Sequence, residues 1–178
     1  MIVNRDEKNN ALILIDEAYF HFHNESMVNY IDVYKNLIIT RTFSKAFGLA
    51  SLRIGLLIAN SDLINELYRV KLVHEITGVA AKIGSFILDN MHIVDNYVKD
   101  VNEGKEVLHA RLSKLDIETH KSDSNLFFFN MPKKTNSKDF LNYLETQKIY
   151  IKGPLTKHPF KGQMRITVGD KKQMTMFC

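Results

Sequence analysis

Two short apolar runs in this 178-residue chain each lead into side chains that could take part in chemistry. The run at residues 12–15 is followed by Asp16 and Tyr19, and the run at residues 37–39 is followed by Lys45. Two hydroxyls shortly before this lysine and a guanidinium after it complete the set: Thr42, Ser44 and Arg53. Each residue has an ordinary explanation as a helix cap, a surface lysine or an ion pair, so the inference depends on their combination.

An amine, a carboxylate, a phenol, hydroxyls and a guanidinium at strand ends are groups that pyridoxal phosphate (PLP) requires. A lysine forms a Schiff base with this cofactor, and an acid pairs with its pyridinium nitrogen. A carboxylate favours the protonated nitrogen, which makes the ring a better electron sink. Hydroxyls and an arginine can hold the phosphate. Ligands of open α/β sheets bind outside the carboxyl ends of the strands, so Asp16 and Lys45 reach one site if their strands are neighbours.

With these motifs the chain resembles the fold-type I PLP-dependent aminotransferases of class I/II, and among them the histidinol-phosphate aminotransferase branch. The resemblance rests on residues 16–19, on residues 42–45 with Arg53, and on residues 164–169. It implies a PLP enzyme that transfers an amino group to or from a small phosphorylated or acidic substrate.

The resemblance also implies roles for individual residues. Lys45 matches the Schiff-base lysine that also transfers protons. Asp16 matches the acid at the pyridine nitrogen, and Tyr19 matches the phenol beside the ring oxygen. The positions that hold the cofactor phosphate are matched by Thr42, Ser44 and Arg53.

Three further residues are expected to bind the substrate. Arg165 matches the small-domain arginine that binds the acidic end of the substrate, although it could instead pair with Asp170. Lys152 stands where the branch has a second arginine, and a lysine keeps the charge but loses the bidentate fork. His74 lies near the expected pocket entrance, in a stretch that departs from the branch pattern. The resemblance therefore implies a substrate different from the usual one of the branch.

Family members carry an N-terminal half that this sequence lacks, and the chain ends inside the expected last helix. We therefore expect a fragment that is inactive alone, from a protein that forms a homodimer, as the resemblance implies. Two other functions stay open: a PLP-dependent decarboxylase of a phosphorylated amino acid, which would use the same cofactor residues, and a non-catalytic remnant.

The composition sets modest bounds. With 45% hydrophobic residues the chain can bury a core, and its net charge of +4 is dispersed, so we expect no nucleic-acid partner. The single cysteine, Cys178, excludes an internal disulfide framework and suits a cytoplasmic location. No apolar run approaches the length of a membrane span, and no signal-peptide pattern opens the chain. His21 and His23 lack a third nearby ligand, so no metal is expected.

Apolar periodicity predicts an α/β fold. The first part is expected to belong to the large domain of the PLP transferases, with a mainly parallel sheet and helices. A small α+β domain is expected to follow, so the predicted domains are residues 1–104 and 105–178. The expected strands are residues 11–15, 37–40, 54–59, 117–119, 126–129, 149–151 and 164–168. The expected helices are residues 61–70, 75–90, 92–114 and 137–146, with a cap at Ser61 or Asp62 and a flexible point at Gly104.

Overall fold

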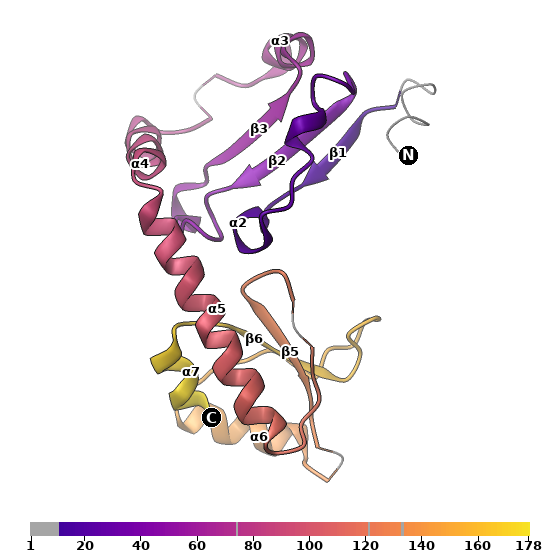
Figure 1. The fold of residues 1–178 in the computed structure, drawn as a ribbon, viewed down its shortest axis with the longest axis vertical. Helices are drawn as coiled ribbons and strands as arrows, with labels where there is room; N and C mark the ends of the chain where they lie inside the picture. The colour runs from indigo at the N-terminus through magenta and orange to yellow at the C-terminus, as the bar shows by residue number, and fades with distance from the viewer. Residues whose placement is uncertain (1–10, 74, 121, 133) are drawn as a thin grey trace. The chain divides into compact units, whose positions relative to one another are not determined.

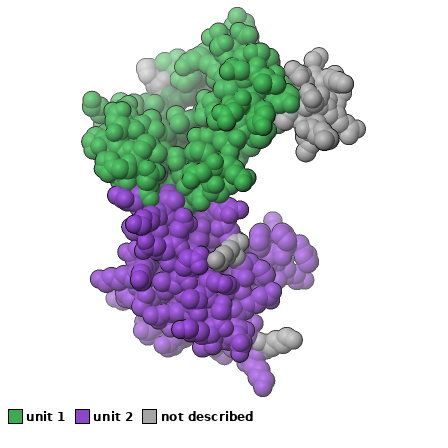
Figure 2. Space-filling model, viewed as in Figure 1, with its two compact units in different colours: residues 1–95 green, residues 96–178 purple. Residues whose placement is uncertain are grey.

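The structure is a computed structural model that describes residues 11–73, 75–120, 122–132 and 134–178. The chain divides into two compact units, residues 1–95 and 96–178, which Figure 2 colours separately. Within the described residues, every helix is too short or too polar to cross a membrane.

The first unit contains a three-stranded sheet with the order β1 (Ile13–Asp16), β2 (Leu37–Thr42) and β3 (Gly55–Ala59). β1 and β2 are parallel neighbours (Figure 1), which meets the condition under which Asp16 and Lys45 reach one site. β3 runs antiparallel to β2, so the prediction of a mainly parallel sheet is wrong for this pair. The reason is that residues 43–54 form a compact connection without the crossover that a parallel strand requires.

The central strand β2 carries the core of this sheet. Residues 37–39 are all buried because neighbouring segments cover both faces of the strand. β1 and β3 are the outer strands of the described sheet, and apolar side chains on or beside them remain exposed: Leu12, Leu14, Leu56 and Leu57.

Helices flank this sheet at both ends of the strands. The short helix α2 (Phe20–His23) follows β1 and was not among the expected helices, and the 3-10 turn η1 (Val28–Tyr30) comes after it. α3 (Ser61–Val70) is capped by the side chain of Asn60 rather than by Ser61 or Asp62. α4 (Gly78–Asp89) is capped by Thr77. In both helices the cap oxygen accepts a hydrogen bond from an otherwise unpaired amide of the first turn.

The second unit is built on an antiparallel sheet of β4 (Thr119–His120), β5 (Leu126–Asn130) and β6 (Gln163–Thr167). The strand predicted at residues 149–151 is absent. In this segment, Lys152 pairs with Arg165 of β6 through an isolated bridge, and the amide of Leu155 donates to the carbonyl of Gln163. The amide of Ile149 instead donates to the carbonyl of Leu144 at the end of α6.

Three helices complete the fold: α5 (His92–Ser113), α6 (Ser137–Thr146) and α7 (Lys171–Phe177). The predicted long helix is therefore confirmed as α5. Its part within the second unit buries Val101, Leu108 and Leu112 at helical spacing. The sheet contributes a facing set of buried side chains: Phe127, Phe129, Met164 and Ile166.

Gly104 is a packing position rather than the flexible point that was expected. α5 continues through it without a break. A Cβ added at Gly104 would overlap the carbonyl oxygen of Gly169 and press on Val168 and Met174. The helix therefore approaches the end of the sheet too closely for any side chain at this position.

Replacing Gly104 with alanine should lower the free energy of unfolding by about 2 kcal/mol, because overpacking a closed contact costs more than helix propensity gains. Gly78→Ala is the matched control, since a Cβ there meets no atom within 4 Å. Urea unfolding of both variants measures the difference. A Gly104→Ala chain as stable as the control would contradict this packing account.

Candidate active site

The predicted chemical residues of the first unit meet at one edge of its sheet. Asp16 ends β1 and lies opposite Thr40 in the parallel register. Thr42 ends β2 and lies opposite Gly55, the first residue of the antiparallel β3. Arg53 comes just before β3 and so stands at the same edge as Asp16. The topology thus brings Asp16, Arg53 and the turn at residues 43–48, called the lysine turn below, to the same end of the strands.

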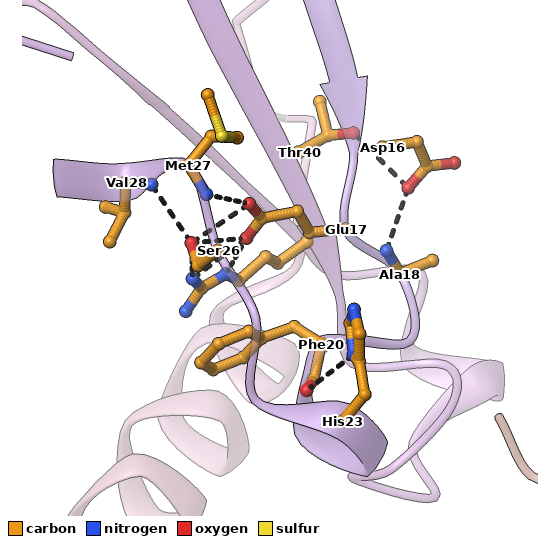
Figure 3. A network of polar contacts seen from close by, with 10 residues as sticks. Asp16, Glu17, Ala18, Phe20, His23, Ser26, Met27, Val28 and Thr40 are labelled. Atoms are coloured by element: carbon orange, nitrogen blue, oxygen red, sulfur yellow. Dashed lines mark hydrogen bonds and ion pairs between the residues drawn. The ribbon is translucent and has the colours of Figure 1, made fainter. Parts of the chain in front are cut away.

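Asp16 presents an open carboxylate at this edge. Its Oδ1 accepts hydrogen bonds from the amide of Ala18 at 3.0 Å and from the hydroxyl of Thr40 at 3.5 Å (Figure 3). Among the described residues, no hydrogen bond reaches Oδ2. One oxygen therefore fixes the orientation of the carboxylate, and the other can accept a ligand proton.

Lys45 lies in a tight turn held by the core. Phe43 and Ala46, on either side of it, are almost completely buried. The hydroxyl of Thr42 accepts a hydrogen bond from the amide of Ser44, and the carbonyl of Lys45 accepts one from Gly48. Gly48 has a φ of 69°, a left-handed conformation that glycine adopts without strain. The turn is thereby closed while the lysine side chain stays available.

The phenol ring of Tyr19 lies next to this lysine. The Nζ of Lys45 is 5.4 Å from the centre of the ring. The two residues are far apart in sequence, and their closeness follows from the parallel pairing of β1 and β2. The sequence-based grouping of Lys45, Tyr19 and Asp16 therefore corresponds to one region of the structure.

Arg53 has a strained backbone. Its φ is 54°, a left-handed conformation that costs a residue with a Cβ about 1–2 kcal/mol. Its Nη1 donates a hydrogen bond to the carbonyl of Ala50 at 3.1 Å, and the residue is exposed. Strain of this kind is frequent at functional positions, which makes Arg53 a candidate for one.

The structure shows an ion pair beside the site that was not predicted from the sequence. The carboxylate of Glu17 forms an ion pair with Arg41, with 2.9 Å between Oε2 and Nη2. The side chains are 6% and 17% exposed. The register of β1 and β2 would have revealed this pair. Glu17 and Arg41 each come one residue after a member of the Asp16–Thr40 pair, so both side chains lie on the face of the sheet opposite to Asp16.

Glu17 also closes the segment that carries Tyr19. Both of its carboxylate oxygens accept hydrogen bonds from the hydroxyl of Ser26, and Oε1 accepts one from the amide of Met27 (Figure 3). The guanidinium of Arg41 lies 3.6 Å from the centre of the Phe20 ring. These contacts form a continuous network from the end of β1 to the end of β2.

His21 joins α2 to the lysine turn. Its ring packs edge-on against Phe47 at 4.8 Å between the ring centres. Burial lowers the pKa of His21, the charge of Arg41 lowers it further, and the carboxylate of Asp95 opposes both. The neutral imidazole is therefore the form that this packing favours.

In the second unit, Arg165 and Lys152 stand side by side. Each amide donates to the carbonyl of the other, at 2.6 and 3.0 Å, so both side chains project from the same face of the sheet. The alternative partner Asp170 caps α7 instead, through the amide of Gln173. Within the described part of the chain no ion pair involves Arg165. His74, the third predicted substrate residue, lies outside the described residues.

The site in the first unit suits a phosphorylated pyridine aldehyde. It offers an amine for the aldehyde, an open carboxylate for the ring nitrogen and a phenol beside the amine. Hydroxyls at Thr42 and Ser44 and the cation of Arg53 can hold a phosphate. The groups present therefore match PLP in number and in charge.

The comparisons agree with this class of site. The sequence pattern of the family described as aminotransferase class I and II matches residues 1–178, and the chain belongs to this family. It is 30% identical over 174 residues to a histidinol-phosphate aminotransferase of Thermotoga maritima, covering 98% of this chain and 50% of that one. It is 34% identical over 168 residues to the enzyme of that name from Sulfurisphaera tokodaii, covering 94% and 44%.

Solved structures show the same fold. The histidinol-phosphate aminotransferase from Clostridium acetobutylicum superposes with a TM-score of 0.83 at 20% identity, covering 99% of this chain and 55% of that one. The L-threonine-O-3-phosphate decarboxylase from Porphyromonas gingivalis gives 0.78 at 23% identity, covering 97% and 54%. The chain thus spans about half the length of the relatives it matches.

Replacing Arg53 with glycine should raise the free energy of unfolding by about 0.5–1 kcal/mol, because glycine removes the left-handed strain. Arg53→Ala loses the same side chain but keeps a Cβ, so we expect it to be no more stable than the parent chain. Guanidinium unfolding of the two variants measures the contrast. Equal stability of the glycine and alanine variants would show that the backbone at Arg53 is unstrained.

Proposed function

We propose that the chain carries the lysine-bearing part of a PLP-dependent aminotransferase that acts on a small phosphorylated or acidic substrate. The observation that carries this proposal is the placement of Lys45 beside Tyr19, at the sheet edge where Asp16 ends its strand. Membership in the aminotransferase class I and II family supports it.

Each site residue then has a task. The amine of Lys45 holds the cofactor and moves a proton. The carboxylate of Asp16 keeps a proton on the pyridine nitrogen, and the phenol of Tyr19 donates to the ring oxygen. When bound, PLP supplies an electron-withdrawing ring that stabilises negative charge on the substrate. The phosphate of the cofactor is assigned to Thr42, Ser44 and Arg53.

Substrate binding is assigned to Arg165 and Lys152. Two adjacent cations without an acidic partner in the described residues favour an anionic substrate, and a phosphate carries enough charge to engage both. The names of the relatives point the same way, since those described above are histidinol-phosphate aminotransferases. His74 belongs to this proposal on the basis of the sequence resemblance.

Transamination is preferred to decarboxylation because the two relatives described above, at 30% and 34% identity, are named as aminotransferases. The decarboxylase structure is 23% identical and supports the fold only. Formation of pyridoxamine phosphate without release of carbon dioxide would separate the two reactions.

The proposal includes an arrangement for the whole protein. Residues 1–104 would belong to a large PLP-binding domain and residues 105–178 to a small one, in a cytoplasmic homodimer. Exposed apolar side chains on an outer strand favour association, and Leu12 and Leu14 are 62% and 61% exposed beside or on β1.

Reduction with borohydride tests the cofactor site. After incubation with PLP, we expect a pyridoxyl group on the peptide that contains Lys45, because the groups around this amine can orient the aldehyde. Peptide mapping by mass spectrometry locates it. Lys45→Ala should remove the adduct, and Lys82→Ala, on the exposed face of α4, should leave it unchanged. Adducts scattered over surface lysines, or none, would contradict the proposal.

A further inference from the structure

We propose that Arg41 is a positioning residue that holds Tyr19 beside Lys45 through its contacts with Glu17 and Phe20. This inference rests on the proposed function, in which the phenol of Tyr19 donates a hydrogen bond to the ring oxygen of PLP. Arg41 itself is assigned no contact with cofactor or substrate.

The guanidinium of Arg41 donates hydrogen bonds from its nitrogens and also stacks on an aromatic ring. Its Nε and Nη2 donate to Oε2 of Glu17 at 3.1 and 2.9 Å, and Nη2 also donates to the hydroxyl of Ser26 at 2.8 Å. Its carbon centre lies 3.6 Å from the centre of the Phe20 ring. Only a planar, delocalised cation can make these contacts together, so a lysine would not replace it.

Two of the residues that Arg41 contacts, Glu17 and Phe20, border the turn that carries Tyr19. Glu17 precedes the turn, and its amide donates to the carbonyl of Thr40 at 2.8 Å. Phe20 follows the turn, and its amide donates to the carbonyl of Glu17 at 3.0 Å. The turn is therefore attached at both ends to one side chain of β2. Moving the backbone of this turn requires that at least one of these contacts break.

Burial makes this attachment stiff. The Glu17 and Arg41 side chains are 6% and 17% exposed, so water competes weakly for their hydrogen bonds. Removing one charge alone would leave the other buried and uncompensated, which is strongly destabilising. The informative variant is therefore the pair Glu17→Gln with Arg41→Met, which removes both charges and keeps most of the side-chain volume.

The test is a cycle of four chains: the parent, the paired variant, Tyr19→Phe, and the paired variant combined with Tyr19→Phe. The dissociation constant for PLP is measured for each. If the pair acts through Tyr19, the paired variant should weaken PLP binding about tenfold when Tyr19 is present and less than about twofold when it is phenylalanine. Glu66→Gln with Arg69→Met removes an exposed ion pair on α3 and should leave PLP binding unchanged.

Hydrogen exchange of residues 18–28 in the cofactor-free chain gives a readout that does not require PLP. We expect the paired variant to exchange faster there, because its turn has lost both attachments. An equal loss of PLP affinity in both Tyr19 backgrounds would overturn the proposal and leave the pair a general stabiliser. If the parent chain fails to bind PLP, the proposed function fails, and exchange decides the inference: unchanged protection of residues 18–28 would overturn it.

Discussion

The parallel pairing of β1 with β2 is the constraint on which the candidate site depends. Asp16 lies opposite Thr40 in this register, and the residue after each turns to the other face of the sheet. A slip of one residue would exchange the two faces, placing Glu17 where Asp16 now stands and moving Asp16 into the buried network. A single backbone register therefore decides which acid is open to a ligand and which is used in the interior.

The two acids illustrate how neighbouring carboxylates take different tasks. Asp16 keeps an exposed carboxylate with hydrogen bonds to one oxygen only, whereas Glu17 is buried and binds Arg41, Ser26 and Met27. The site residues also accept local strain, as the left-handed backbone of Arg53 shows. The buried side chain of Phe43 and the buried Glu17–Arg41 pair stabilise the surrounding structure, and this stability offsets the strain at Arg53.

Local patterns in the sequence predicted most elements, and long-range contacts account for the differences. Periodic apolar residues located α5 and α6 closely, and the runs before Asp16 and Lys45 located β1 and β2. The sequence left open whether these two strands are neighbours, and the structure shows that they are. The roles of Lys45, Asp16 and Tyr19 remain predictions. The Glu17–Arg41 pair and the close contact at Gly104 depend on segments distant in sequence, so propensity and periodicity carry no information about them. The missing strand at residues 149–151 also depends on contacts that periodicity does not show, since the amide of Ile149 bonds to Leu144 at the end of α6 and pairing with β6 is limited to a bridge at Lys152.

A crystal structure of the chain grown with PLP would show whether Lys45 and Asp16 hold the cofactor. We expect electron density that runs without a break from the Nζ of Lys45 into the cofactor, with the pyridine nitrogen beside the carboxylate of Asp16. Cofactor density attached to another lysine, or a ring whose nitrogen points away from Asp16, would contradict this expectation.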